Sequence, residues 1–180
     1  MHSHPLHLFS HCPRCGGEFA INDARSKRCV DCGFTYYLNA SAAVAAFIVN
    51  DQGELLVAQR AKEPARGTLD LPGGFVDPGE ALETALMREV KEETGALLQS
   101  ASYLFSLPNV YLYSDFEVHT TDAFFLCSID QDSPLRSADD VESLQWIAPH
   151  DIHADDFGLQ SIRRAIRYFL QMPHNVSKPA

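Results

Sequence analysis

Apolar residues recur along the chain with two different periods, and these periods predict a mixture of strands and helices. Apolar runs of strand length predict β-strands at residues 42–49, 54–60, 102–107, 117–129 and 144–147. Positions 159, 162, 166, 169 and 170 are apolar at helical spacing, which predicts a helix over residues 157–172. Another helix is predicted over residues 78–94. Strands and helices mixed in this way favour an α/β or α+β sandwich.

Turn-forming residues separate these elements. The sequence Asn50-Asp51-Gln52-Gly53 joins the first two strands, so we expect a hairpin, although the alanines of residues 42–49 also allow a helix. Loops are predicted over residues 62–68 and 130–140, which are polar and contain prolines. Between them, Leu71-Pro72-Gly73-Gly74-Phe75 is expected to be an extended, glycine-bearing segment.

The chain divides into a small N-terminal module and one larger domain. Large aliphatic residues are scarce at the start of the chain, so we place a module at 1–38, a domain at 39–172 and a polar tail at 173–180. Three aromatic residues are expected to pack the module onto the domain: Phe34, Tyr36 and Tyr37. Four histidines before the first cysteine are expected to lie in a solvated tail: His2, His4, His7 and His11.

The charge of the chain argues against several partners. Lys and Arg number 14 and Asp and Glu 24, a formal net charge of −10. Neither the module nor the domain is basic, so we expect no nucleic-acid partner, because phosphate contacts need basic side chains. No run of about 18 apolar residues is present, so we expect no membrane span. The first residues do not resemble a signal peptide, so we expect cytoplasmic localisation.

Four of the five cysteines form two pairs separated by 13 residues, Cys12 with Cys15 and Cys29 with Cys32. Glycine follows each pair and lets the backbone turn so that its amides point at sulfur. Two such turns supply four thiolates in the tetrahedron that zinc prefers, and the full ligand set favours a structural site. Two disulfides would suit a secreted module, which the start of the chain does not favour. Cys127 lies in an apolar run and is expected to be buried.

The ends of the helix predicted at 78–94 carry recognisable signals. Asp77 fits the N-cap and Pro78 the first helical position, while Glu80 fits a capping box. Gly95 fits the C-terminal stop.

The second half of this helix is strongly acidic. An apolar stripe begins at Leu82 and Leu86, and the same spacing continues at Glu89, Glu92 and Glu93. Like charges at these spacings repel, and facing them inward adds a desolvation cost. A hard divalent cation removes this conflict, so we expect Mg²⁺ or Mn²⁺ here. Such an ion would also let an acidic protein bind a phosphorylated substrate.

These residues carry a resemblance to a known family. The segment resembles the Nudix box, the signature of the Nudix hydrolases, at Gly74, Glu80, Arg88, Glu89, Val90, Glu92, Glu93 and Gly95. Ala96 stands where the family usually has a larger aliphatic residue, and the cysteine pairs resemble the zinc ribbon that precedes some members. The resemblance implies an α/β/α sandwich with a mixed sheet, preceded by a zinc ribbon. It also implies hydrolysis of a pyrophosphate bond in a nucleoside diphosphate linked to another group.

The resemblance also implies roles for individual residues. Glu89, Glu92 and Glu93 would hold Mg²⁺ or Mn²⁺, with a backbone carbonyl of Gly73 or Gly74 nearby. Glu80 and Arg88 would orient those ligands, and Glu93 or Glu89 would accept the proton of the attacking water. An additional acid often completes such a site, and the later chain offers three candidates: Glu117, Asp122 and Glu142.

The substrate is less narrowly defined by the sequence. An NADH pyrophosphatase-like architecture is suggested by the ribbon, but of that branch's downstream motif only Ser106 and Pro108 match. Dinucleotides such as NADH or ADP-ribose are the leading substrates, followed by nucleoside triphosphates and nucleotide sugars. Residues that could contact the substrate are Phe75, Tyr111, Tyr113 and His119, and Phe47 is a further aromatic candidate.

Two functional hypotheses remain from the sequence. The first is a metal-dependent nucleotide pyrophosphatase with a small-molecule substrate. The second is a non-catalytic Nudix-like module that binds a nucleotide or a partner and uses the ribbon for docking. No glutamate of the box is missing, which favours the enzyme. Homodimers are common in the resembling family, and the sequence is compatible with one.

Overall fold

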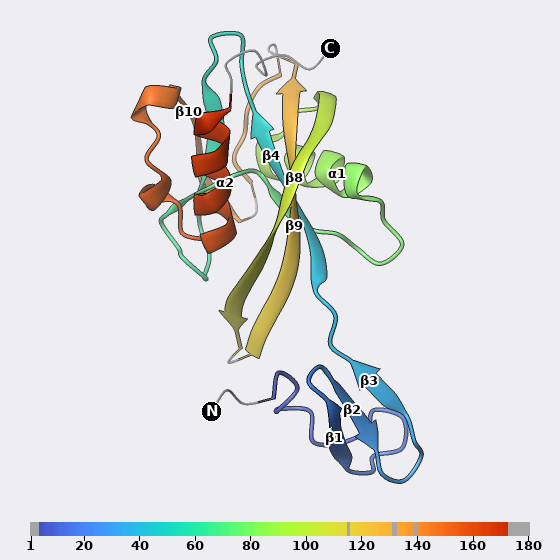
Figure 1. The fold of residues 1–180 in the computed structure, drawn as a ribbon. Coiled ribbons are helices and arrows are strands. Elements are labelled where there is room, and N and C mark those ends of the chain that lie inside the picture. The colour runs from blue at the N-terminus through green and yellow to red at the C-terminus, as the bar shows by residue number, and fades with distance from the viewer. Residues whose placement is uncertain (1–3, 115, 131–132, 139, 173–180) are drawn as a thin grey trace.

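The computed structural model describes residues 4–114, 116–130, 133–138 and 140–172, and of Tyr111 the backbone alone. The predicted tail at 173–180 lies outside the described residues. The chain forms a small N-terminal sheet module joined to a larger domain with two sheets and two α-helices, a mixed α/β fold (Figure 1). Within the described residues, no helix is long and apolar enough to cross a membrane.

The central sheet of the larger domain contains four strands in the order β7-β4-β9-β8. They are β4 (Ser41–Ile48), β7 (Gly73–Phe75), β8 (Leu98–Tyr113) and β9 (Phe116–Ile129). β4 runs parallel to β9 and antiparallel to β7, while β8 and β9 form a long antiparallel hairpin. The sheet is therefore mixed, as the family resemblance implied. β8 is longer than the strand predicted at 102–107, because its pairing with β9 extends past the apolar run.

The second sheet contains three strands in the order β10-β5-β6. They are β5 (Leu55–Arg60), β6 (Leu69–Asp70) and β10 (Val141–Ile147). The predicted hairpin between the first two strands of the domain is wrong, since β4 and β5 belong to different sheets. A single bridge between Val49 and Leu55 is formed, after which β5 pairs with β10. The turn after β4 therefore carries the chain from one sheet to the next.

The two helices, α1 (Leu82–Thr94) and α2 (Gln160–Gln171), cover opposite faces of the central sheet (Figure 1). Side chains of β4 alternate between the two faces, as the pleat of a strand requires. Val44, Ala46 and Ile48 pack with α1, whereas Ala45 and Phe47 pack with α2. Two short 3₁₀ turns, Pro149–Asp151 and Ala154–Asp156, lead into α2. The result is an α/β/α arrangement with an apolar core on each face of the sheet.

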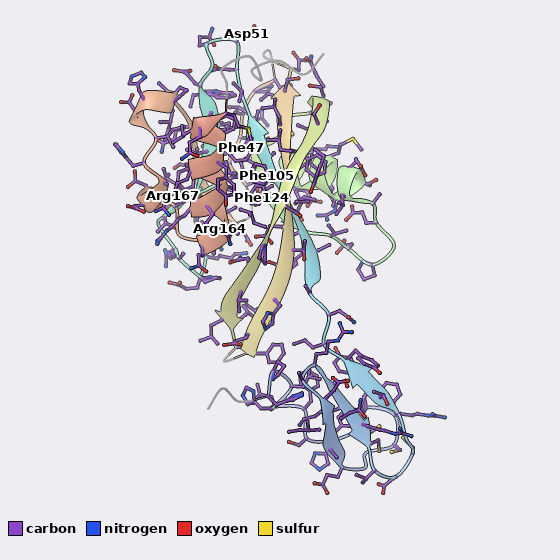
Figure 2. The ribbon with its side chains drawn as sticks, in the orientation of Figure 1. Phe47, Asp51, Phe105, Phe124, Arg164 and Arg167 are labelled. Atoms are coloured by element: carbon purple, nitrogen blue, oxygen red, sulfur yellow. The ribbon has the colours of Figure 1, made fainter. Side chains whose placement is uncertain are left out.

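Phe47 lies in the core and not in a ligand pocket, contrary to its suggested role at a base. It is fully buried, and its ring stacks on that of Phe169 with centroids 4.4 Å apart. Phe105 and Phe124 lie beside it (Figure 2). Cys127 is also buried, in the core that faces α1, as its apolar surroundings predicted.

Helix α1 begins four residues later than the sequence signals indicated. Residues Asp77 to Glu80 form a turn, in which the Glu80 amide donates to the Asp77 carbonyl (3.0 Å). Gly79 has φ +85° in this turn, a conformation that a right-handed helix cannot include. The N-cap is therefore Ala81, and Asp77 and Pro78 lie outside the helix. Its end is as predicted, with Gly95 in the left-handed conformation at the C-cap.

The N-terminal module is a three-stranded antiparallel sheet with its own small core. Its strands are β1 (Phe19–Asp23), β2 (Ser26–Cys29) and β3 (Thr35–Tyr37), in that order. Phe34 packs inside this core against Phe19 and does not join the module to the domain as predicted. Tyr37 is largely exposed. The expected interface therefore involves other residues.

The segment before the first cysteine is only partly a solvated tail: His7 and His11 are exposed as expected, whereas other residues are packed. Leu6 is fully buried, and His4 Nε2 donates to the Asp23 carbonyl oxygen at 2.8 Å. The ring of Phe9 stacks on Tyr36 with centroids 5.6 Å apart. On its other side it meets Phe116, at the tip of the β8–β9 hairpin, with centroids 5.7 Å apart. An aromatic residue of the module thus contacts the domain, but it is Phe9. His2 lies outside the described residues.

Candidate active site and zinc site

A cavity of about 280 Å³ lies between the two sheets of the larger domain. Its floor is the central sheet, where Ala43 and Ala45 leave room above β4. Asp70 of β6 and Leu159, just before α2, line the opposite side. Glu93 of α1 reaches the same space, so the acidic helix borders a cavity of the size expected for part of a small-molecule site.

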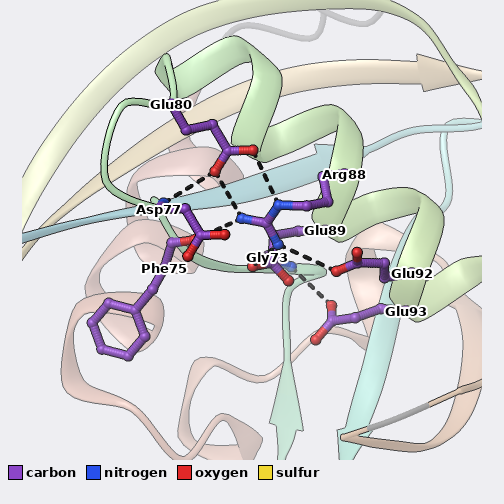
Figure 3. Close-up of polar contacts among 8 residues, drawn as sticks. All are labelled: Gly73, Phe75, Asp77, Glu80, Arg88, Glu89, Glu92 and Glu93. Carbon is purple, nitrogen blue, oxygen red and sulfur yellow. Dashed lines mark hydrogen bonds and ion pairs between the residues drawn. The ribbon is translucent and has the colours of Figure 1, made fainter.

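Arg88 is the centre of a charged network on α1 (Figure 3). Its guanidinium donates two hydrogen bonds to the carboxylate of Glu80, at 3.0 and 2.9 Å. The same group donates to Glu89 at 2.7 Å and to Glu92 at 3.2 Å. It also donates to the backbone carbonyl of Phe75 at 3.0 Å, which ties α1 to β7. The hydrogen bonds from Arg88 lower the pKa of Glu80. The positions of Glu80 and Arg88 suit the orienting roles that the resemblance implied.

Glu93 differs from the other box carboxylates because it has no cationic partner among the described residues. Its Oε2 atom accepts a hydrogen bond from the Gly73 amide at 2.9 Å (Figure 3). Burial, with the nearby charges of Asp70 and Glu89, raises the pKa of Glu93 to about 8. Burial also raises the pKa of Glu89. A partly buried carboxylate without a cationic partner, beside a second carboxylate, fits a divalent metal ion with oxygen ligands.

The stripe of buried residues on α1 differs from the one predicted. It runs through Ala85, Leu86, Val90 and Thr94, so the core contact continues past the middle of the helix. Glu93 lines the cavity and Glu89 lies against Gly74, which also lines it, while the Glu92 side chain is 51% exposed. In a helix with 3.6 residues per turn, positions three and four residues apart lie on either side of the same stripe, so one of them can face the cavity while the other faces solvent. The three carboxylates therefore do not all face inward.

The two glycines before α1 allow close contact between β7, β4 and the helix. A Cβ atom on Gly73 would lie 2.1 Å from the backbone carbonyl oxygen of Val44, which is closer than any real contact. A Cβ atom on Gly74 would lie 2.5 Å from Glu89 Oε1. Glycine at these positions brings the backbone against the carboxylates, where the resemblance places a backbone carbonyl ligand.

The four cysteines of the N-terminal module converge on one point. Their sulfur atoms all lie within 4.8 Å of one another, with Cys12 to Cys32 at 3.7 Å and Cys15 to Cys29 at 3.5 Å. Zinc bound tetrahedrally at about 2.3 Å would hold its sulfur ligands about 3.8 Å apart. Backbone amides point at the sulfurs as expected, since the Cys32 amide lowers the pKa of Cys29 to about 7. The cluster therefore fits a structural zinc ion.

The structure places some of the predicted substrate residues at the cavity and not others. Phe75 and Tyr113 line the cavity, from β7 and the end of β8. His119 is absent from the described lining, and its ring lies 3.8 Å from the exposed carboxylate of Glu117. The side chain of Tyr111 lies outside the described residues. No contact role follows for His119 from this arrangement.

Of the three acids proposed to complete the site, only Asp122 lines the cavity in the described structure. It is buried, whereas Glu117 and Glu142 are exposed. Sequence reasoning missed the pair of buried Asp70 and partly buried Arg60, whose charged groups lie 2.5 Å apart in the cavity wall. The sequence indicates this pair only through the charged residue at the end of each of two short strands. It also missed Asn109, because nothing in the sequence distinguishes it from other polar strand residues before the pairing of β8 is known.

The raised pKa of Glu93 predicts a pH-dependent effect of metal on stability. Without metal, the folded chain holds a proton on Glu93 up to about pH 8, whereas the unfolded chain loses it near its ordinary value of 4.5. The stability that this proton contributes is complete below about pH 4.5 and is lost as the pH rises through about 8. At about pH 6 a metal ion must displace the proton, but at about pH 8.5 it need not. We therefore expect Mg²⁺ to raise the Tm by several degrees more at the higher pH.

Thermal melting with and without Mg²⁺ at both pH values measures this effect. Glu93→Gln has no titratable group at position 93, so Mg²⁺ should raise its Tm by the same small amount at each pH. An equal rise in Tm at both pH values for the unmodified chain would contradict the prediction.

A comparison with protein families shows to which family the chain belongs. The NUDIX domain family model matches residues 40–169, most of the larger domain and all of the cavity. The chain belongs to the Nudix family. The match includes the loop and helix that hold the acidic network, and it ends within α2.

Curated relatives match the chain over parts of their length. The mouse 8-oxo-dGDP phosphatase NUDT18 is 44% identical over 66 residues, 37% of this chain and 20% of the relative. The ADP-ribose pyrophosphatase of Methanocaldococcus jannaschii is 32% identical over 115 residues, 63% of this chain and 64% of the relative. The NAD-capped RNA hydrolase NudC of Photobacterium profundum is 34% identical over 107 residues, 59% of this chain and 40% of the relative. The chain thus covers less than two thirds of each of them.

Solved structures support the fold over most of the chain. A Nudix hydrolase from Nitrosomonas europaea superposes with a TM-score of 0.72 at 21% identity and covers 95% of both chains. A bifunctional NMN adenylyltransferase/ADP-ribose pyrophosphatase from Francisella tularensis, complexed with AMP and a manganese ion, gives a TM-score of 0.56 at 22% identity. It covers 75% of this chain and 42% of that one.

Proposed function

We propose that this Nudix protein hydrolyses a pyrophosphate bond in a nucleoside diphosphate linked to another group. Dinucleotides such as NADH or ADP-ribose are the proposed substrates. The observation that carries the proposal is the position of Glu93, a partly buried carboxylate at the edge of the cavity, within a segment that keeps every glutamate of the Nudix box. Relatives named for ADP-ribose and for NAD-capped RNA support the substrate class.

In the proposed reaction, water attacks one phosphorus atom and the bridging P–O bond breaks, which yields two phosphate monoesters. Glu93 accepts the proton of the attacking water, and Glu89 is the alternative acceptor. Glu89 and Glu93 would hold Mg²⁺ or Mn²⁺, with Glu92 at the exposed margin and a carbonyl of Gly73 or Gly74 nearby. When bound, the metal would neutralise phosphate charge and lower the pKa of water. Arg88 and Glu80 keep the carboxylates in place through the contacts described above.

The N-terminal module is proposed to bind one structural zinc ion through Cys12, Cys15, Cys29 and Cys32. All five cysteines are free in the structure, which suits thiolate ligands. Thiols of this kind persist in a reducing compartment, which supports the cytoplasm as the proposed location. The excess of acidic residues supports a small-molecule substrate and not a nucleic acid as the partner. A homodimer remains part of the proposal on the basis of the family resemblance.

A substrate panel tests the reaction class. It contains NADH, NAD, ADP-ribose, diadenosine polyphosphates, nucleotide sugars, nucleoside triphosphates and NAD-capped RNA, each with Mg²⁺ or Mn²⁺. We expect release of phosphate monoesters from ADP-ribose or NADH, and little from triphosphates or capped RNA. No turnover across the panel, from folded and zinc-loaded protein, would contradict the enzyme and favour the nucleotide-binding module.

A further inference from the structure

The floor of the cavity contains buried polar side chains where the core would otherwise continue. On β9, Asp122 and Thr120 lie on the same face of the strand as the apolar residue Phe124. On β8, Leu107 is followed by Asn109. The register places Asn109 opposite Thr120 and Leu107 opposite Asp122, so the three polar residues form one patch. Burying polar groups in this way is costly unless they gain hydrogen-bond partners.

Asp122 is held in place by two hydroxyl groups. Thr120 Oγ1 donates to its Oδ1 atom and Ser161 Oγ, from α2, donates to its Oδ2 atom, both at 2.5 Å. The residue is only 7% exposed and lines the cavity. A carboxylate can accept about four hydrogen bonds, so Asp122 retains acceptor capacity beyond these two contacts. An uncharged ligand in the cavity can use that capacity by donating a hydrogen bond.

Asn109 has an unused hydrogen-bonding group on the same wall. It is 5% exposed and lines the cavity, and among the described residues no hydrogen bond reaches its side-chain amide. No fully buried side-chain nitrogen or oxygen in the described structure lacks a partner, so the amide must border the open space. It offers both a donor and an acceptor to a ligand.

The charges around the cavity restrict what that ligand can be. Arg60 is the basic side chain among the lining residues described, and it is already paired with Asp70. The acidic lining residues are Glu63, Asp70, Glu93, Asp122 and Asp140. In the absence of a metal ion, such a lining disfavours a phosphate group, and around Asp122 it favours an uncharged group that carries hydrogen-bond donors. At the rim, the exposed aromatic rings of Phe75 and Tyr113 can pack against a flat ring.

We propose that Asp122, together with Asn109, recognises hydrogen-bond donors on the uncharged nucleoside end of the substrate, foremost the exocyclic amine of an adenine base. The proposal rests on the proposed function and adds to it a specificity-determining pair. Asp122 accepts from the amine, and Asn109 contacts the adjacent ring nitrogen or the amine itself.

Binding of non-hydrolysable nucleotides tests the proposal independently of turnover. Calorimetry would compare AMP with purine riboside 5′-monophosphate, which lacks the amine, and with 2′-deoxy-AMP and 3′-deoxy-AMP, which lack one ribose hydroxyl. We expect AMP to bind about 10- to 100-fold more tightly than the amine-free analogue, the range for a hydrogen bond to a charged group. In Asp122→Asn this preference should fall to within about twofold, because the charge is lost and one acceptor becomes a donor.

Two further variants separate recognition from folding. Thr120→Val removes one support of Asp122 but keeps the carboxylate, so the preference for AMP should persist. Asn109→Leu extends the apolar face of Leu107, so it should weaken AMP binding without lowering the Tm. If a deoxy analogue and not the amine-free one loses affinity, and Asp122→Asn removes that loss, the ribose is the donor that Asp122 recognises. If folded Asp122→Asn binds all four nucleotides as the unmodified chain does, the proposal is wrong, whatever the panel shows.

Discussion

Replacement of Glu93 by Gln should lower turnover of the preferred substrate by about 100-fold or more and leave the fold intact. The loss is expected because the amide can neither accept a proton nor contribute negative charge to a metal site, and a positioned general base alone contributes about 10²- to 10⁴-fold. The fold should survive because Gln matches Glu in shape and can still accept the hydrogen bond from the Gly73 amide. Removing a buried carboxyl without a cationic partner should even raise the Tm of the metal-free protein.

Steady-state kinetics with circular dichroism and melting curves would measure both parts of this prediction. Glu83→Gln is a matched control, because Glu83 is an exposed acid in the first turn of the same helix. It should keep the turnover of the unmodified chain. If Glu93→Gln retained its activity, α1 would not be the catalytic helix, and the assignment of the Nudix box residues would have to be withdrawn.

Replacement of Cys12 by Ser should abolish zinc binding and unfold the N-terminal module. Cys12 is buried and its sulfur is one corner of the four-thiol cluster. Structural zinc contributes about 10–16 kcal/mol of apparent binding free energy in small peptides, and modules below about 40 residues seldom fold without such a site. We therefore expect zinc to fall from about one ion per chain to almost none.

Zinc analysis of the purified protein and a two-step melting curve would record this loss. Cys127→Ala is the control, because this cysteine is buried in the core of the larger domain, far along the chain from the cluster. It should keep its zinc and show only a lower Tm for the domain. Unchanged zinc content in Cys12→Ser would show that the four thiols do not act as a ligand set.

The parts of the molecule that the sequence predicted well are those fixed by short-range spacing. The paired cysteines converge because each pair lies in one tight turn. Strand β9 and helix α2 occur near their predicted positions because their apolar patterns are long and regular. The placement of Glu93 beside a cavity also follows from helical spacing, once the helix packs on the sheet.

The parts that sequence reasoning missed depend on contacts between distant segments. The turn after β4 is a sound hairpin signal, yet β5 gains a longer partner in β10, some 80 residues later. Asn109 and Asp70 meet in one cavity only because two different sheets face each other. Local propensity indicates neither the strand with which β5 pairs nor the residues that meet in the cavity. Leu6 was overlooked for the same reason, since a single apolar residue among histidines becomes significant only when it is buried.

The contact between Phe9 and Phe116 has a practical meaning for anyone who wishes to isolate the catalytic domain. A fragment that starts at residue 39 would lose the ring of Phe9, which contacts Phe116 at the hairpin tip. The tip already exposes Leu112 and Tyr113 on β8, the edge strand of the central sheet. Uncovered apolar side chains on an edge strand favour self-association. The N-terminal module is therefore expected to limit self-association of the domain, and a trimmed domain should aggregate more readily.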